Sequence, residues 1–375
     1  MRELTISVYF LYEWWNKYFH NTIPRPQYIS DDNLDMMYLN RKRFLFDEFG
    51  QFDIGEENPV MDGDYVNIVT KYGMDLIPYL YGANLTCQAV GGWMPDFFSR
   101  DALSRMEPVD IAKHPFAEWF LNTREQKIKR YGSVKAFLDY ESPTNIAVRL
   151  RGEEFYSDLL EDPEFSRHVL ELSTAAIEYI FKFLDTFPVM PKEKKAANFS
   201  IGNCNVTMIS EGLYTELIKP FDIRLINRIE ELTGRTWTMQ LHHCDVPVDR
   251  FLDAYKDLPR LTALQASHST DIQAVREKMP GVSFQSMISP LEMMGALEEL
   301  EKKFDRAIRL GSTELDFWNI DPAVSPEKLR AMFTSITKSA NAYNVTPVFS
   351  VIPFVWDELE WAYPQYQEKK RHEPF

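Results

Sequence analysis

The sequence of 375 residues predicts an α/β fold with a parallel sheet, on three observations. From about residue 60 onward, short apolar runs alternate with segments of helical periodicity, which is the pattern of βα units. Five or six such units fall in roughly the last 180 residues, and two or three more fit before them, which gives the eight units of a TIM-type (β/α)8 barrel. No Gly-x-Gly-x-x-Gly turn follows a predicted strand, which disfavours the alternative, a doubly wound open sheet.

The clearest predicted helix begins at Asp162-Pro163, because proline is favoured at the first helical position. Its apolar face consists of Phe165, Val169, Leu172, Ala176, Tyr179 and Phe183. Pro220 is expected to kink or split a later helix. The predicted elements after the first helix are, in order, strand 197–201, a helix from about Ser210 to Gly234, strand 236–242, helix 248–257, strand 261–267, helix 270–278, strand 282–288, a long helix 290–310, strand 314–319, a helix that starts at Ser325-Pro326, and strand 346–352.

We predict a single domain with an N-terminal helical elaboration over residues 1–60 and the barrel over residues 61–375, because no Pro/Gly/Ser-rich linker separates the two segments. The first segment carries an aromatic cluster of Trp14, Trp15, Tyr18 and Phe19. We expect this cluster on a helix side that is buried or that faces a second copy in a homodimer, and a substrate lid is the alternative.

Composition and charge exclude several classes of protein. The formal net charge of −15 argues against a broad phosphate-binding surface, so we expect no nucleic-acid partner. The N-terminus is a poor signal peptide, and no apolar run approaches the ~20 residues that span a bilayer. Cys87, Cys204 and Cys244 make an odd number without tight spacing, which is typical of reduced thiols. We therefore expect a cytoplasmic protein with no membrane partner.

A short motif in the stretch 235–245 predicts a metal site. His242 and Cys244 lie two residues apart at the end of a predicted strand, so alternation directs both side chains to one face. Imidazole nitrogen and thiolate sulfur are preferred zinc ligands, and the carboxyl ends of barrel strands carry active sites. The alternative is a packed thiol beside a hydrogen-bonded histidine. On either interpretation, His243 points to the opposite face and is expected in the core or in a supporting role behind the site.

Three segments carry a resemblance to a known family. Residues 209–221, ISEGLYTELIKPF, look like that family's helix entry; residues 241–245, LHHCD, resemble its H-x-C-G strand end; and residues 320–329, IDPAVSPEKL, are similar to its final turn. On these motifs the chain resembles the uroporphyrinogen decarboxylase superfamily, which includes the decarboxylase and cobalamin-dependent methyltransferase components. The resemblance covers roughly residues 145–345 and implies a distorted TIM barrel with a deep pocket at the carboxyl ends of its strands.

Departures from the decarboxylase pattern favour the methyltransferase branch. Residues 1–60 lack the arginine-rich stretch that holds carboxylates of the porphyrinogen, and a pocket for a poly-acid needs such fixed cations. No acid occurs near Gly82 to Asn84, where the key aspartate of the decarboxylases should fall, and Asn319 occupies the position of their histidine.

The methyltransferase branch binds zinc through His-x-Cys and a distant second cysteine. His242 and Cys244 match the first two positions, whereas the distant cysteine also aligns with Asn319. Cys204, just beyond the preceding strand, is a candidate third ligand, and a packed turn residue is its alternative role. The other candidates for the third ligand are Glu314, Asp316 and Asp321, with helix capping or pairing to Arg309 as their alternative roles.

The resemblance implies a zinc-dependent methyltransferase whose partner is a corrinoid protein, with cobalt that takes or gives the methyl group. The zinc would either hold an acceptor thiol as a thiolate or act as a Lewis acid on the atom that loses the methyl group. Because a mixed set of nitrogen, sulfur and oxygen ligands leaves the metal more electrophilic, we favour transfer from a small donor, a methyl ether or a methylamine, to the cobalt. His268 is predicted as a general acid, and Asn203 and Asn319 as further catalytic residues. The residues expected to line a substrate pocket, or alternatively to pack the barrel core, are Trp237, Met287, Phe317 and Trp318.

Two other functions stay open on the sequence alone. A metal-independent decarboxylase or lyase of the same fold would use Asn203, His268 and Asp321. A protein that binds a tetrapyrrole or a corrinoid without catalysis would need none of them, because function resides in the site and not in the barrel.

Overall fold

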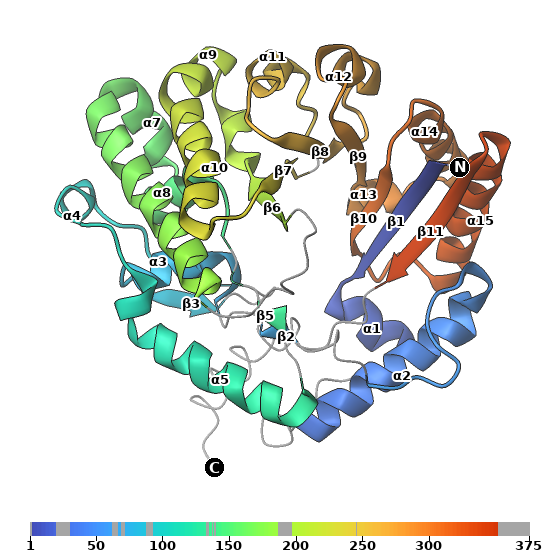
Figure 1. Cartoon of the computed structure of the whole chain (residues 1–375). Helices are drawn as coiled ribbons and strands as arrows, with labels where there is room; N and C mark the ends of the chain where they lie inside the picture. The colour runs from blue at the N-terminus through green and yellow to red at the C-terminus, as the bar shows by residue number, and fades with distance from the viewer. Residues whose placement is uncertain are drawn as a thin grey trace. The chain divides into compact units, whose positions relative to one another are not determined.

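A computed structural model describes residues 2–19, 31–61, 67–68, 72–87, 93–132, 135–136, 138, 140–186, 197–244 and 246–351 (Figure 1). The strands are β1 (Arg2–Phe10), β2 (Asn67–Ile68), β3 (Leu85–Cys87), β4 (Trp93–Pro95), β5 (Lys135–Ala136), β6 (Ala197–Gly202), β7 (Trp237–His242), β8 (Leu261–Ser267), β9 (Ser283–Ile288), β10 (Glu314–Ile320) and β11 (Val345–Val351). The α-helices are α1 (Tyr12–Phe19), α2 (Asp31–Phe49), α3 (Leu76–Leu80), α4 (Arg100–Leu103), α5 (Pro115–Tyr131), α6 (Pro143–Arg151), α7 (Glu154–Glu161), α8 (Pro163–Asp185), α9 (Glu211–Leu213), α10 (Lys219–Thr233), α11 (Leu252–Tyr255), α12 (Ile272–Lys278), α13 (Pro290–Met294), α14 (Leu297–Arg309) and α15 (Pro326–Ala342).

The predicted α/β fold with a parallel sheet is confirmed. Seven of the described strands form one sheet in the order β11-β1-β10-β9-β8-β7-β6, and each strand pair with an assigned register is parallel. Helices follow the strands along the chain, as in a TIM-type barrel. Among the described residues, β6 and β11 stay at the two edges of this sheet, and no pairing between them closes it.

The described residues fall into two compact units. One unit consists of described residues from the ranges 2–61, 243–252 and 262–351, and it contains β1, β9, β10 and β11. In this unit β1 pairs with β10 on one side and β11 on the other, so the N-terminal strand lies between the last two strands of the sequence. Helix α15 packs against α14 and against β11 (Figure 1).

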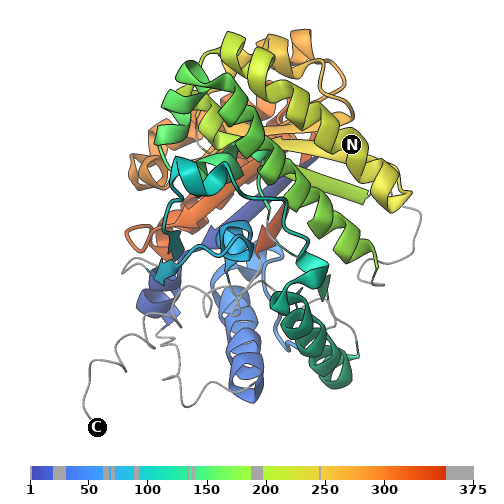
Figure 2. The same ribbon diagram turned by 90° about the vertical axis from the view of Figure 1, so that its left-hand side faces the viewer.

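The other unit draws on the ranges 62–242 and 253–261, and it contains β6, β7 and the long helices α8 and α10. The two helices run side by side (Figure 2). Helix α8 begins where the sequence predicts, because the side chain of Asp162 accepts a hydrogen bond from the N–H of Phe165 at 3.0 Å and Pro163 needs no such partner. Five of the six residues of its predicted apolar face are buried, and Tyr179 is half-buried.

The helix predicted from Ser210 to Gly234 is split, and Pro220 explains the position of the split. Ser210 caps its start, Gly234 ends it in the left-handed conformation at φ 61°, and a π-helical turn over Tyr214–Ile218 separates α9 from α10. Proline lacks an N–H and crowds the preceding turn, and the wider π turn relieves that crowding.

Three sequence predictions need correction. The long helix 290–310 is two helices, α13 and α14, because Gly295 ends the first one. The helix 248–257 is a 3₁₀ turn over Asp249–Phe251 followed by the short α11. The N-terminal segment is predicted as a helical elaboration, but its residues 2–10 form β1. The division of the chain at residue 60 stays a prediction. The sequence also predicts a solvated, lysine-rich loop at 192–195, and this segment lies outside the described residues.

The N-terminal aromatic cluster is largely buried, as the first of its expected roles requires. Trp14 and Trp15 of α1 are at most 1% exposed, and the indole N–H of Trp14 donates to the carbonyl oxygen of Val324 at 2.7 Å. The rings of Tyr18 and Phe19 pack on Trp14 and Trp15 respectively. Among the described helices, none is long and apolar enough to cross a bilayer.

Candidate metal centre

The carboxyl ends of β6 and β7 bring the His-x-Cys motif next to Cys204. The two strands are parallel, and their register pairs Gly202 with His242, the last residue of each strand. Burial alternates along β7 and beyond it, so His242 is half-buried, His243 is buried and Cys244 is exposed. The predicted separation of His243 from the two candidate ligands is therefore correct.

Cys204, His242 and Cys244 form a group that could hold a metal ion. One ligand atom from each residue lies within 4.8 Å of the other two. Tetrahedral zinc with Zn–S bonds of about 2.3 Å places its ligand atoms roughly 3.8 Å apart, so the spacing and the donor types both fit a zinc ion. Neither cysteine is in a disulfide. Two sulfur donors and one nitrogen donor leave a fourth tetrahedral position for a further ligand.

The three acids named as alternative ligands have other contacts. Glu314 accepts a hydrogen bond from the hydroxyl of Ser7 on β1, and burial raises the pKa of Glu314 although this bond opposes the rise. Asp316 accepts from the amide of Gln265 at 2.7 Å, and Asp321 accepts from the backbone N–H of Ala323 at 2.6 Å. None of the three belongs to the group of described residues that could hold a metal ion, whereas Cys204 does.

Hydrogen bonds hold the turn that carries Cys204 from three directions. The carbonyl oxygen of Gly202 accepts from the N–H of Ser142 at 3.1 Å, and the N–H of Asn203 donates to the carbonyl oxygen of His242 at 2.8 Å. On the other side of the cysteine, the N–H of Asn205 donates to the side chain of Asn145 at 3.0 Å. The backbone on both sides of Cys204 is therefore fixed by β7 and by the start of α6.

A buried polar cluster lies behind this turn, and sequence reasoning found only one of its members. One carboxylate oxygen of Asp222 accepts from the hydroxyl of Tyr214 at 2.8 Å and from the amide of Asn203 at 3.1 Å. All three side chains are at most 1% exposed. Burial raises the pKa of Asp222 to about 7, although both hydrogen bonds oppose the rise. A signal was present, since Asp222 interrupts the buried stripe of α10 that continues through Leu225 and Ile229.

His268 follows β8 and belongs to a different cluster. Its Nδ1 lies 3.2 Å from a carboxylate oxygen of Glu292, and that carboxylate also pairs with Lys303. Burial lowers the pKa of His268, and the charge of Glu292 opposes this only in part. A histidine with a lowered pKa is uncharged at neutral pH, which disfavours the predicted role as a general acid.

The predicted pocket residues have different surroundings. Trp237 starts β7, at the opposite end of the strand from His242, and its ring packs edge-on against Phe181 at 5.6 Å, which favours a core role. Met287 is buried in β9. Phe317 is also buried and packs edge-on against Phe304 of α14 at 5.6 Å. These three residues have the contacts of a packed core, which was the alternative to pocket lining.

Trp318, by contrast, is 41% exposed, at an irregularity in β10. Between Val8 and Phe10 the register of the β1–β10 pair shifts by one residue, so that Trp318 and Asn319 lie opposite the single residue Tyr9. Asn319 adopts the left-handed conformation at φ 57°, and the rings of Trp318 and Tyr9 lie 4.7 Å apart. Such bulges redirect side chains near active sites. The predicted pocket role is thus compatible with the location of Trp318 alone among the four.

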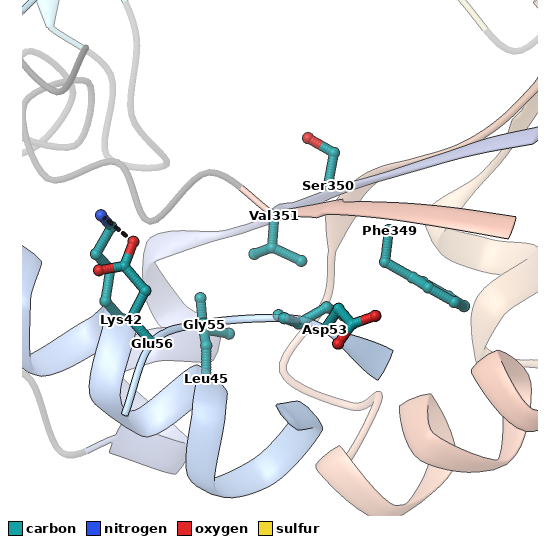
Figure 3. A pocket seen from close by; sticks show the side chains of 9 residues that line it. Lys42, Leu45, Asp53, Gly55, Glu56, Phe349, Ser350 and Val351 are labelled. Carbon is teal, nitrogen blue, oxygen red and sulfur yellow. Dashed lines mark hydrogen bonds and ion pairs between the residues drawn. The ribbon is translucent and has the colours of Figure 1, made fainter. Parts of the chain in front are cut away.

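A separate pocket of about 250 Å³ lies beside the carboxyl end of β11 (Figure 3). Its walls include Phe349 to Val351 and the segment from Asp53 to Glu56, and Lys42 pairs with Glu56 at 2.6 Å at its edge. None of the residues that the sequence predicts for the site lines this pocket, so we do not assign it to the metal centre.

Comparisons with known proteins agree with this architecture. A family model described as uroporphyrinogen decarboxylase (URO-D) matches residues 74–338. Among solved structures, a methyltransferase from Methanosarcina mazei is similar at a TM-score of 0.59 and 12% sequence identity, with 90% of this chain and 93% of that chain covered. At this identity the likeness shows the fold alone. None of the curated protein sequences matches the chain. Because the family model covers more than half of the sequence, the chain belongs to the uroporphyrinogen decarboxylase family.

Proposed function

We propose that this protein is a zinc-dependent methyltransferase that moves a methyl group from a small methylated donor to the cobalt of a corrinoid protein. The observation that carries the proposal is the group of Cys204, His242 and Cys244, which offers three possible ligand atoms for a metal ion at the carboxyl ends of adjacent strands. Family membership and a methyltransferase as a structural neighbour support the reaction class. The resemblance of the His-x-Cys motif to the corrinoid-dependent branch supports the acceptor.

The three residues would hold zinc as two thiolates and one neutral imidazole. Both cysteines must lose their protons and His242 must stay uncharged, so metal binding would release protons and weaken as the pH falls. A zinc ion held in this way would act as a Lewis acid on the oxygen or nitrogen that loses the methyl group. We propose a cytoplasmic location, because the site requires Cys204 and Cys244 as reduced thiols outside any disulfide.

The donor we propose is a methyl ether or a methylamine. In the reaction the bond from carbon to oxygen or nitrogen breaks, and the electron pair of Co(I) forms the new bond to the methyl carbon. An ether oxygen or a neutral amine nitrogen then takes up a proton, whereas an ammonium nitrogen leaves as the neutral amine without one. The exposed face of Trp318 suits an aromatic ether by stacking or a methylated ammonium by cation–π attraction.

The first test is metal content by mass spectrometry on the wild type, His242→Ala, Cys244→Ala and the control Cys87→Ala. We expect about one zinc per chain in the wild type and in the control, and a loss of zinc in the two ligand variants. The loaded protein is then assayed for methylation of Co(I) cobalamin with panels of methyl ethers and methylamines. A protein that binds no zinc, or that keeps it in both ligand variants, would contradict the proposal and favour a metal-independent lyase of the same fold.

A further inference from the structure

The buried carboxyl group of Asp222 is costly for the fold, and the residues around it indicate what it does. Its side chain is enclosed in the same unit that contains β6 and β7, and one of its oxygens has no hydrogen-bond partner among the described residues. Burying a carboxyl group without full hydrogen bonding costs free energy, so such groups cluster at functional sites. The other oxygen accepts from Tyr214 and Asn203, and Asn203 is adjacent to Cys204.

The π-helical turn explains how Tyr214 and Asp222 meet. Residues eight apart in a regular α-helix differ by about 80° in direction, since each residue turns by about 100°. The extra residue of a π turn makes this separation behave like seven residues, which differ by only about 20°. The turn over Tyr214–Ile218 therefore brings the hydroxyl of Tyr214 onto the same face as Asp222, at a hydrogen-bond distance of 2.8 Å.

Asn203 connects this carboxyl group to both neighbouring ligands. Its backbone N–H bonds to the carbonyl oxygen of His242, and its own carbonyl carbon forms the peptide bond to Cys204. Its side chain is fully buried and donates to Asp222. Side-chain and backbone bonds together fix both ends of this residue, so the direction in which the chain enters Cys204 depends on the bond to Asp222.

We infer that Asp222 is a positioning residue for the metal ligand Cys204 and acts on it through the side chain of Asn203. The inference rests on the proposed function, because it takes Cys204 as a zinc ligand. Tyr214 holds the carboxyl group in place, and Asp222 in turn holds Asn203. The removal of a residue that orients a metal ligand through hydrogen bonds typically weakens metal affinity by roughly 10- to 100-fold.

The test measures zinc affinity by competition with a chromophoric chelator, and the thiolate-to-cobalt absorption of the Co(II)-loaded protein. For Asp222→Ala we expect about a tenfold weaker affinity and a changed cobalt spectrum. Asp222→Asn keeps an oxygen acceptor at the same position, so we expect it to restore affinity to within about threefold of the wild type. The matched control is Asp257→Ala, which removes a largely exposed carboxylate paired with Lys219 of α10 at 3.3 Å and should change neither readout.

A double-mutant cycle of Asp222→Ala with Asn203→Ala tests whether Asp222 acts on Cys204 through Asn203. If Asp222 acts through Asn203, the double variant binds zinc no more weakly than the weaker single variant. Asn203→Ala also leaves the bond between Tyr214 and Asp222 intact, so it tests the inference if Asp222→Ala does not fold. Wild-type affinity in folded Asp222→Ala and in Asn203→Ala, or fully additive losses in the double variant, would overturn the inference. Wild-type affinity in Cys204→Ala would instead contradict the proposed zinc site itself.

Discussion

The N–H of Asn203 donates to the carbonyl oxygen of His242 at 2.8 Å, so a backbone bond joins one candidate ligand to the residue before another. This bond continues the parallel pairing of β6 and β7 by one step beyond Gly202. The separation of Cys204 from His242 is therefore set by strand pairing and does not need a bound metal to establish it. A site that is organised before the metal arrives loses less conformational entropy on binding.

Replacing Cys204 should weaken zinc binding more than replacing any of the three acids. Cys204→Ala removes one of three sulfur or nitrogen donors, and we expect a loss above about 100-fold, since even partners behind a ligand are worth roughly 10- to 100-fold. Asp316→Asn is the matched control, because it preserves shape and the hydrogen bond from Gln265. Chelator competition gives both affinities. The reverse ranking would identify an acid as the third ligand.

The buried carboxyl group of Asp222 should make the stability of the protein depend on pH in a defined direction. Its pKa is about 7 in the folded protein against 3.8 for an unperturbed aspartate, so the folded state binds the proton more tightly than the unfolded state. The free energy of unfolding should therefore fall as the pH rises from about 4 to about 7, by up to about 1.4 kcal/mol per pH unit, and level off above that range.

Asp222→Asn removes this titration. Urea unfolding at several pH values between 5 and 8 gives the free energy of unfolding of the wild type and of the variant. As the pH rises to about 7, the variant should gain stability relative to the wild type. The conservative Asp257→Asn, on an exposed carboxylate, should run parallel to the wild type. Parallel curves for Asp222→Asn as well would show that the folded protein does not perturb this carboxyl group.

The sequence predicted most strands of the sheet and two of the candidate ligands because both depend on local patterns. The predicted and observed bounds of β8 are identical, and those of β7 and β9 differ by one residue at one end. Each of these strands is a short apolar run between turn signals. His242 and Cys244 were found because alternation along a strand decides which side chains share a face. Cys204 was found as a candidate because parallel strands bring their carboxyl ends together.

The remaining features depend on contacts that no local pattern encodes. Strand β1 is the first element of the chain, yet its partners are β10 and β11, more than 300 positions later. The bond between Asn203 and Asp222 joins residues 19 apart through a π turn that α-helical periodicity does not predict. Phe317 and Met287 had two predicted roles, pocket lining and core packing, and their burial, which favours the core, depends on tertiary contacts.

The pKa of His268 should respond in opposite directions to its two charged neighbours. Glu292 raises it and Lys303 lowers it, whereas burial is the largest influence and lowers it. We expect Glu292→Gln to lower the pKa of His268 further and Lys303→Met to raise it. The titration of the His268 ring protons by NMR measures both shifts. Shifts of the same sign in the two variants would contradict the arrangement of the three side chains.

Phe317 and Trp318 are neighbours in β10 whose replacement should have opposite consequences. Phe317 is fully buried against α14, so Phe317→Ala should lower the free energy of unfolding by about 3–5 kcal/mol. Trp318→Ala removes mainly the contact with Tyr9, so it should lower the free energy of unfolding by only about 1 kcal/mol.

If Trp318 contacts the methylated donor, Trp318→Ala should raise KM and leave kcat nearly unchanged, because it removes binding energy that substrate and transition state share. Urea unfolding and steady-state kinetics on this pair separate core packing from substrate contact, and an unchanged KM in Trp318→Ala would remove this residue from the substrate pocket.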